Sequence, residues 1–138
     1  MKTTCMHRCP EAGLLIMRLT LGGLLLIHGL AKILGGVGFI EGMLTSAGLP
    51  AFIAYGVYIG EVVAPIMLMI GFRARIAALI IIFNMLVAIG LVHMGDLFSV
   101  GQNGGYALEL QFFFLLNAVA LFFTGAGRLA VSKSNSWD

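Results

Sequence analysis

Residues 51–94 read AFIAYGVYIGEVVAPIMLMIGFRARIAALIIIFNMLVAIGLVHM, and this stretch decides the fold. It contains two apolar runs, 51–71 and 74–94. Each run has the ~20 residues that a helix needs to cross the ~30 Å of hydrocarbon in a bilayer. The sequence GFRAR at residues 71–75 leaves almost no connection between the runs. We therefore expect two transmembrane helices that lie antiparallel and side by side.

Two further apolar runs, 13–34 and 106–124, have a similar length. The chain of 138 residues is 60% hydrophobic and 10% charged, with a mean hydropathy of +1.05, which lies outside the range of soluble domains. The sequence predicts an all-α fold, a four-helix transmembrane bundle that forms one integral membrane domain over residues 1–138. Too few residues remain for a βαβ unit of ~30 residues, which excludes a nucleotide-binding fold.

The connections carry their own signals. Residues 35–50 place apolar side chains at helical spacing and end with Gly48 and Pro50, a pattern typical of the end of a helix. We expect a short helix there, lying at the membrane interface. Residues 95–105 are rich in turn formers. The polar segment 128–138 is predicted to be a cytoplasmic tail, disordered over 132–136.

The distribution of basic residues predicts the topology. Glu41 and Asp96 occupy the first and third connections, whereas basic residues flank the opposite ends of the spans. These basic residues are Lys2, Arg8, Arg73, Arg75, Arg128 and Lys133. The positive-inside rule then places both termini in the cytoplasm, and we expect a bacterial inner (plasma) membrane protein in a lipid bilayer. The net charge of +2 is scattered rather than clustered, so no nucleic-acid partner is expected.

Five ionisable side chains fall inside or at the rim of the apolar runs: Arg18, His28, Lys32, Glu61 and Glu109. A charge at the centre of a bilayer costs roughly 2.5–3.5 kcal/mol on insertion scales, so such residues usually face the bundle interior and mark a functional site. In the first span, Arg18 and Lys32 share one helical stripe with Gly22, Leu25 and Gly29. Since small residues permit close helix approach, we expect this stripe to be buried.

The second span contains the sequence Glu61-Val-Val-Ala-Pro65. Proline has no N–H group, so the backbone carbonyl of Glu61 loses its normal helical donor. Membrane helices tolerate an unpaired backbone carbonyl where a neighbouring group donates a hydrogen bond to it. We expect a kinked helix that presents Glu61 near the middle of the bilayer.

The positions of the other polar residues along the predicted spans place them at a membrane depth close to that of Glu61. Lys32, His93, Asp96 and Glu109 should lie near the outer interface, and His28 about one turn below. Lys32 can pair with either Glu61 or Glu109, and the sequence leaves both pairings open. The candidate catalytic residues are Glu61, Lys32 and Glu109. The candidate ligand-binding residues are His28, His93, Arg18 and Asp96.

An apolar pocket with hydrogen-bond donors and an acid suits a quinone, with Glu61 or Glu109 exchanging the proton that accompanies reduction. No metal site is predicted, because the spacing of Cys5, His7 and Cys9 matches no standard zinc pattern. The chain also lacks cysteine sets for iron–sulfur clusters and a flavin fold. If redox chemistry occurs here, a partner subunit, such as a soluble redox partner, or a bound cofactor must supply it.

Two other functions fit the same residues. Glu61 could bind substrate and proton alternately in a small proton-coupled transporter, although the polar residues lie toward one side of the membrane. Alternatively, the charges could specify helix pairing in a structural assembly protein. The Gly-rich helix surfaces also favour a homo-oligomer.

The order of several motifs resembles the DoxX-like family, which includes DoxD-type members. The motifs are Arg18-Leu-x-Leu-Gly22, His28-Gly-x-x-Lys32, Gly48-Leu-Pro50, Glu61, Gly71-Phe-x-x-Arg75, Ala77-Ala78 and Gly125-x-Gly127-Arg128. The resemblance implies a four-helix membrane protein. It also implies a subunit of a membrane oxidoreductase, such as a thiosulfate:quinone oxidoreductase, that is not catalytic alone. The recurring polar positions of the family fall on Arg18, Lys32, Glu61, Arg75 and His93.

Overall fold

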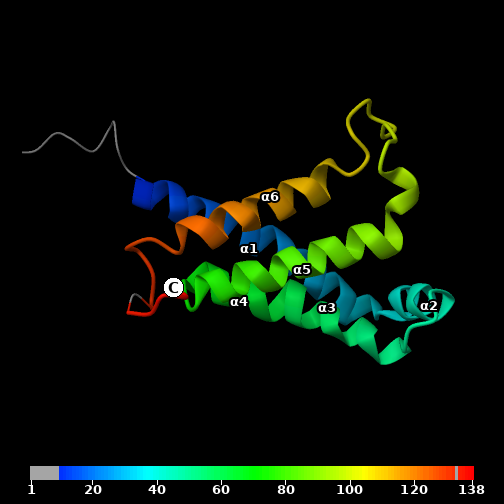
Figure 1. Cartoon of the computed structure of the whole chain (residues 1–138), viewed down its shortest axis with the longest axis horizontal. Helices are drawn as coiled ribbons and strands as arrows, with labels where there is room; N and C mark the ends of the chain where they lie inside the picture. Colours follow the sequence, from blue (N-terminus) through cyan, green and yellow to red (C-terminus); the bar gives the residue numbers. More distant parts are fainter. Residues whose placement is uncertain (1–9, 133) are drawn as a thin grey trace, which may run out of the picture.

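The computed structural model describes residues 10–132 and 134–138, and these residues form a bundle of helices (Figure 1). The elements in chain order are α1 (Pro10–Gly35), α2 (Gly38–Ser46), the 3₁₀ helix η1 (Ala51–Tyr55), α3 (Gly56–Tyr58), the π-helix η2 (Ile59–Val63), α4 (Ala64–Ile70), α5 (Ala74–Val92), the 3₁₀ helix η3 (Met94–Asp96) and α6 (Glu109–Thr124). The predicted all-α fold is confirmed. Cys5, His7 and Cys9, together with Lys2, Arg8 and Lys133, lie outside the described residues.

Among the described residues, three helices are long and apolar enough to cross a membrane: Pro10–Gly35, Ala51–Ile70 and Ala74–Val92. The second of these is continuous through η1, α3, η2 and α4. The fourth apolar helix, α6, has 16 residues and is about 24 Å long at 1.5 Å per residue. It therefore falls short of the full hydrocarbon thickness.

The helix α6 begins at Glu109 rather than at residue 106, where the apolar run starts. Tyr106 instead pairs with Val100 in an isolated antiparallel bridge, and the N–H of Ala107 donates to the carbonyl of Ser99. The N–H of Glu109 then closes a turn onto the carbonyl of Tyr106. These backbone bonds hold residues 106–108 in a turn, so the helix is shorter than hydropathy predicts.

The connections gather at two opposite ends of the bundle (Figure 1). One end holds the start of α1, the α4–α5 turn and the segment after α6, and we call it the tail end. The other end holds α2 and the connection between α5 and α6, and we call it the loop end. Residues 35–50 do form the predicted short helix, α2, and Gly48 follows it with a φ of +76°.

The core lies where α1 packs on α4 and η2, and where α5 packs on α4 and α6. Small side chains allow α4 and α5 to lie close together: Ala64, Ala74, Ala77 and Ala78 are fully buried. The predicted antiparallel pair is thus confirmed. Large apolar side chains such as Phe83 and Leu116 remain exposed on the outside of the bundle, as expected for helices that face lipid rather than water.

The segment after α6 folds back under the bundle at the tail end. The N–H groups of Val131 and Ser132 donate to the carbonyls of Ile70 and Gly71 at 3.1 and 3.2 Å, and Ala130 is buried. The N–H of Arg75 donates to the carbonyl of Trp137 at 3.2 Å. The described part of this segment thus contacts the end of α4, whose carbonyls offer acceptors that composition does not reveal. The disorder predicted for 132–136 stays a prediction.

Candidate functional site

Glu61 lies at the centre of the π-helix η2. The N–H of Ala64 donates to the carbonyl of Ile59, five residues earlier instead of four. Pro65 follows at the start of α4 and has no N–H to donate. The backbone therefore widens by one residue just before the proline, and π-bulges of this kind occur frequently at functional sites. The expected irregularity is present, and it takes the form of a π-turn.

Two glycines of α1 let this helix approach the irregular segment. A Cβ atom at Gly29 would overlap the backbone carbonyl of Glu61, and one at Gly22 would lie 2.9 Å from the carbonyl oxygen of Pro65. Both glycines are buried, together with Arg18 and Leu25 from the same stripe. The predicted burial of this stripe is confirmed except at Lys32, which is partly exposed, and the closest contact of the two glycines falls at Glu61.

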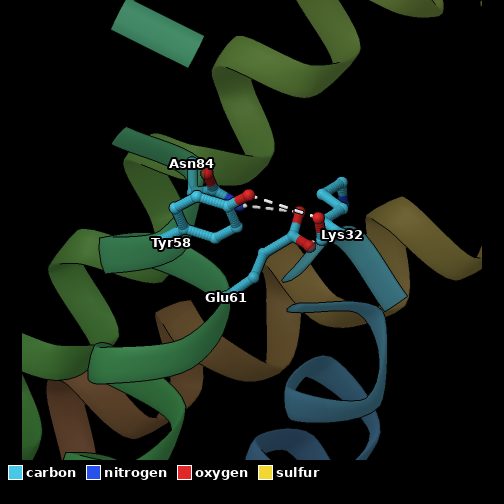
Figure 2. A network of polar contacts seen from close by, with 4 residues as sticks. All are labelled: Lys32, Tyr58, Glu61 and Asn84. Carbon is cyan, nitrogen blue, oxygen red and sulfur yellow. Dashed lines mark hydrogen bonds and ion pairs between the residues drawn. The ribbon is translucent and has the colours of Figure 1, made fainter. Parts of the chain in front are cut away.

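Lys32 forms an ion pair with Glu61, between the Nζ atom and Oε2 (Figure 2). The side chain of Glu61 is 6% exposed, whereas that of Lys32 is 29% exposed. The structure thus selects one of the two pairings that the sequence left open. Pairing lowers the cost of holding each charge in the apolar interior.

Two other residues complete the polar network around this pair (Figure 2). The side-chain amide of Asn84, from α5, donates to Oε1 of Glu61 at 3.4 Å, and the Tyr58 hydroxyl donates to the carbonyl of Lys32 at 3.2 Å. Gly60 makes room for this approach, since a Cβ atom there would overlap the side chain of Asn84. Both oxygens of the Glu61 carboxylate therefore have a partner.

A cavity of about 160 Å³ lies beside the ion pair. It is lined by side chains from α1, η2, α5 and α6, and by the residue that follows α5: Leu25, His28, Lys32, Glu61, Met85, Ala88, His93, Leu110, Gln111 and Phe114. We call it the polar cavity. Its lining combines a carboxylate, an ammonium group, two imidazoles and an amide with hydrocarbon. Such a mixture is typical of small-molecule sites, where a few polar groups fix the orientation of an apolar ligand.

His93 links the polar cavity to the loop end. Its Nε2 atom lies 3.3 Å from Nε2 of Gln111, and its Nδ1 atom lies 3.8 Å from Oδ2 of Asp96. Asp96 itself is more than half exposed. An amide that donates to Nε2 leaves the proton on Nδ1, facing Asp96. These three side chains form a chain of titratable and hydrogen-bonding groups from the surface to the cavity.

Two of the predicted site residues lie elsewhere. Glu109 is exposed at the start of α6, and its carboxylate lies beside Gly105 instead of lining the polar cavity. Arg18 is fully buried at the tail end, where its guanidinium group donates to the carbonyl of Leu129 and lies against Gly71. Its Nε and Nη1 atoms have no hydrogen-bond partner among the described residues. Arg18 therefore holds the tail segment against the end of α4.

Three residues of the site were not among the sequence candidates: Tyr58, Asn84 and Gln111. Tyr58 stands three residues before Glu61, which places both on one helical face, and this spacing was a usable signal. Asn84 is a lone amide in the middle of an apolar run. Gln111 follows Glu109 in the first turns of α6, and its role depends on the position of His93, which sequence does not give.

Comparison with known proteins identifies the family of this chain. The model of the DoxX family matches residues 13–94, a range that includes Lys32, Glu61, Asn84 and His93. The chain is 30% identical over 126 residues to a protein of Bacillus subtilis (strain 168) named "Putative oxidoreductase CatD", covering 91% of this chain and 89% of that relative. No solved structure matches the chain significantly. With more than half of its length matched by the family model, this membrane protein belongs to the DoxX family.

Proposed function

We propose that the chain is the membrane subunit of an oxidoreductase and that the polar cavity binds the head group of a quinone or quinol. The observation that carries the proposal is the buried Glu61–Lys32 pair, which borders a cavity that also presents His28, His93 and Gln111. A structural ion pair alone would not require a cavity beside it. The relative named as an oxidoreductase supports the same class of activity.

The size of the polar cavity fits a single ring. An engineered cavity of about 150 Å³ in another protein binds benzene. The polar cavity, at about 160 Å³, offers similar space and adds hydrogen-bonding groups along its wall. Leu25, Met85 and Phe114 supply the apolar surfaces that pack on the faces and edge of a ring. A quinone head group meets both requirements, since it is a flat ring with two carbonyl oxygens.

The side chains around the cavity suit proton exchange with such a ligand. A bound quinone would supply two-electron chemistry that is coupled to the uptake of two protons. Lys32 and His28 can donate hydrogen bonds to an oxygen in the cavity, and Glu61 can hold a proton at Oε2 in place of its bond to Lys32. His93 lines the polar cavity and its Nδ1 atom lies 3.8 Å from Oδ2 of the exposed Asp96, so this imidazole offers a route for protons from the loop end.

The described residues offer no group that stores electrons, so we propose that a soluble redox partner supplies them. Arg73, Arg75 and Arg128 lie at the tail end, whereas Glu41 and Asp96 lie at the loop end. By the positive-inside rule, the tail end then faces the cytoplasm of a bacterial inner membrane. The exposed apolar helix surfaces also leave room for a homo-oligomer in the bilayer.

The proposal is tested by identifying and measuring the ligand. The protein is purified with its native lipids, and organic extracts are analysed by mass spectrometry for quinones. Binding of a tail-less benzoquinone is then titrated to the wild type, Glu61→Gln and Glu41→Gln, the last being a matched carboxylate-to-amide control in α2. We expect co-purified quinone, and affinity that falls about tenfold or more in Glu61→Gln alone, because tenfold corresponds to the loss of one good polar contact. Absence of quinone in the extract together with no measurable binding by the wild type would overturn the proposal.

A further inference from the structure

A second cavity lies on the seam between α1 and α6, next to the polar cavity. Its volume is about 220 Å³, and its lining consists of Ile16, Met17, Thr20, Leu21, Phe113 and Asn117. We call it the seam groove. The lining is mostly hydrocarbon, and Nδ2 of Asn117 donates to the carbonyl of Phe113 at 2.8 Å. The seam groove therefore offers an apolar surface to its occupant.

The two cavities follow one another along the same pair of helices. On α1, Leu21 of the seam groove stands one turn before Leu25 of the polar cavity. On α6, which runs antiparallel to α1, Phe113 of the seam groove is adjacent in sequence to Phe114 of the polar cavity. His28 of α1 contacts Phe114 of α6 edge-on within the lining of the polar cavity, with ring centroids 5.9 Å apart.

The seam is open toward the surrounding lipid. The helix α6 packs mainly on α5 and less closely on α1. Ile16 and Phe113, which border the seam groove, are 64% and 51% exposed, and His28 is exposed at the polar cavity. Both cavities thus border the exposed surface along the seam between α1 and α6.

We propose that the seam groove holds the hydrocarbon tail of the same ligand whose head group occupies the polar cavity, and that this ligand enters laterally between α1 and α6. This inference rests on the proposed function. Its physical basis is that the seam between α1 and α6 is polar beside Glu61 and becomes apolar one helical turn further toward the tail end. An amphipathic molecule with a ring at one end and an isoprenoid chain at the other matches this change from a polar to an apolar lining.

In a membrane the seam groove gains little from hydrophobicity, because lipid chains are as apolar as its own lining. Its contribution is to direct the tail, so that the head group enters the polar cavity in one orientation. We therefore expect tail recognition to change affinity by about tenfold, not by many orders of magnitude.

Two measurements test the inference in the intact chain in nanodiscs. The first is photocrosslinking of the wild type with a benzoquinone whose isoprenoid tail carries a diazirine. We expect adducts on peptides that contain residues 16–21 and 113–117. The second compares the affinities of long-tailed and tail-less benzoquinones for Thr20→Trp, which fills the seam groove, and for Leu19→Trp, which places the same side chain on the neighbouring exposed position. We expect Thr20→Trp to weaken only the long-tailed ligand, by about tenfold, and Leu19→Trp to weaken neither.

Several outcomes would overturn the inference. Adducts spread evenly over the exposed apolar surface, with unchanged affinities in Thr20→Trp, would mean that the tail lies in bulk lipid while the proposed head-group site stands. A photoactivatable phospholipid that labels residues 16–21 and is not displaced by the quinone would assign the seam groove to lipid, and crosslinked pairs of chains would assign it to a second copy. No binding of the tail-less benzoquinone by the wild type, together with absence of quinone in the extract, would instead remove the proposed function itself. Because the photocrosslinking arm uses the wild type, a folding defect in Thr20→Trp does not leave the inference untested.

Discussion

Gly29 of α1 lies directly against the backbone carbonyl of Glu61, with no room for a side chain between the two helices. This contact lies beside the π-turn that precedes Pro65, and it brings α1 close enough for Lys32 to reach the Glu61 carboxylate. The charged pair and the glycine are therefore parts of one arrangement, in which close backbone packing positions the polar side chains.

Adding a methyl group at position 29 should disturb this arrangement. We expect Gly29→Ala to lower the free energy of unfolding by about 1–3 kcal/mol, the usual cost of overpacking, because the new Cβ would overlap the Glu61 carbonyl. Unfolding in detergent micelles, followed by circular dichroism, measures the change. Gly23→Ala is the matched control, since a Cβ at Gly23 meets no atom within 4 Å. Equal stability of the two variants would contradict the predicted contact.

Lys32 and Glu61 should be energetically coupled. Lys32→Met leaves the buried carboxylate without its cation, and Glu61→Gln leaves the ammonium group without its anion. We expect a double-mutant cycle of these substitutions to give a coupling free energy of about 1–3 kcal/mol. This is below the 3–5 kcal/mol typical of breaking a fully buried pair, because Lys32 is 29% exposed. Additive effects of the two substitutions would show that Lys32 and Glu61 do not pair in the folded protein.

The contact between Gly60 and Asn84 should control the third member of the network. A Cβ at position 60 would displace the Asn84 side chain from Glu61, so Gly60→Ala and Asn84→Ala should remove the same interaction. We expect each substitution to destabilise the protein by about 1–3 kcal/mol and their effects to be clearly less than additive. Gly56→Ala serves as the control, because a Cβ there meets no atom within 4 Å. Full additivity would place Asn84 away from Gly60.

The tail segment should depend on Gly71. This residue has a φ of +73°, and a Cβ there would overlap the Arg18 guanidinium group and Ala130. Gly36 has a φ of +81° with no atom within 4 Å of a Cβ, so Gly36→Ala reports the backbone strain alone. We expect Gly71→Ala to be the more destabilising variant by about 1–3 kcal/mol and to cleave faster after Arg128 in limited proteolysis by trypsin. Identical cleavage rates in the two variants would show that the tail does not pack on Gly71.

Much of the fold followed from local sequence. Hydropathy identified the three long helices, because a helix that crosses hydrocarbon needs a continuous apolar run. Gly48 marked a helix end through a backbone conformation that glycine adopts easily. The start of α6 and the course of the tail were missed, because both depend on backbone hydrogen bonds to distant residues, such as those from Val131 and Ser132 to the end of α4.

For the site, the sequence by itself determined which charged side chains have a high free-energy cost in the membrane and are therefore candidates for a functional site. A carboxylate and an ammonium group in apolar runs must be paired or buried, so Glu61 and Lys32 could be chosen without coordinates. Only the tertiary structure decided that Lys32 pairs with Glu61 and that Glu109 lies outside the polar cavity. It also showed that Arg18 holds the tail, and that Tyr58, Asn84 and Gln111 join the site. The physical reason is that hydrophobicity acts along each helix separately, whereas partner choice depends on the rotation and separation of neighbouring helices, which here are set by close contacts at Gly22, Gly29 and Gly60.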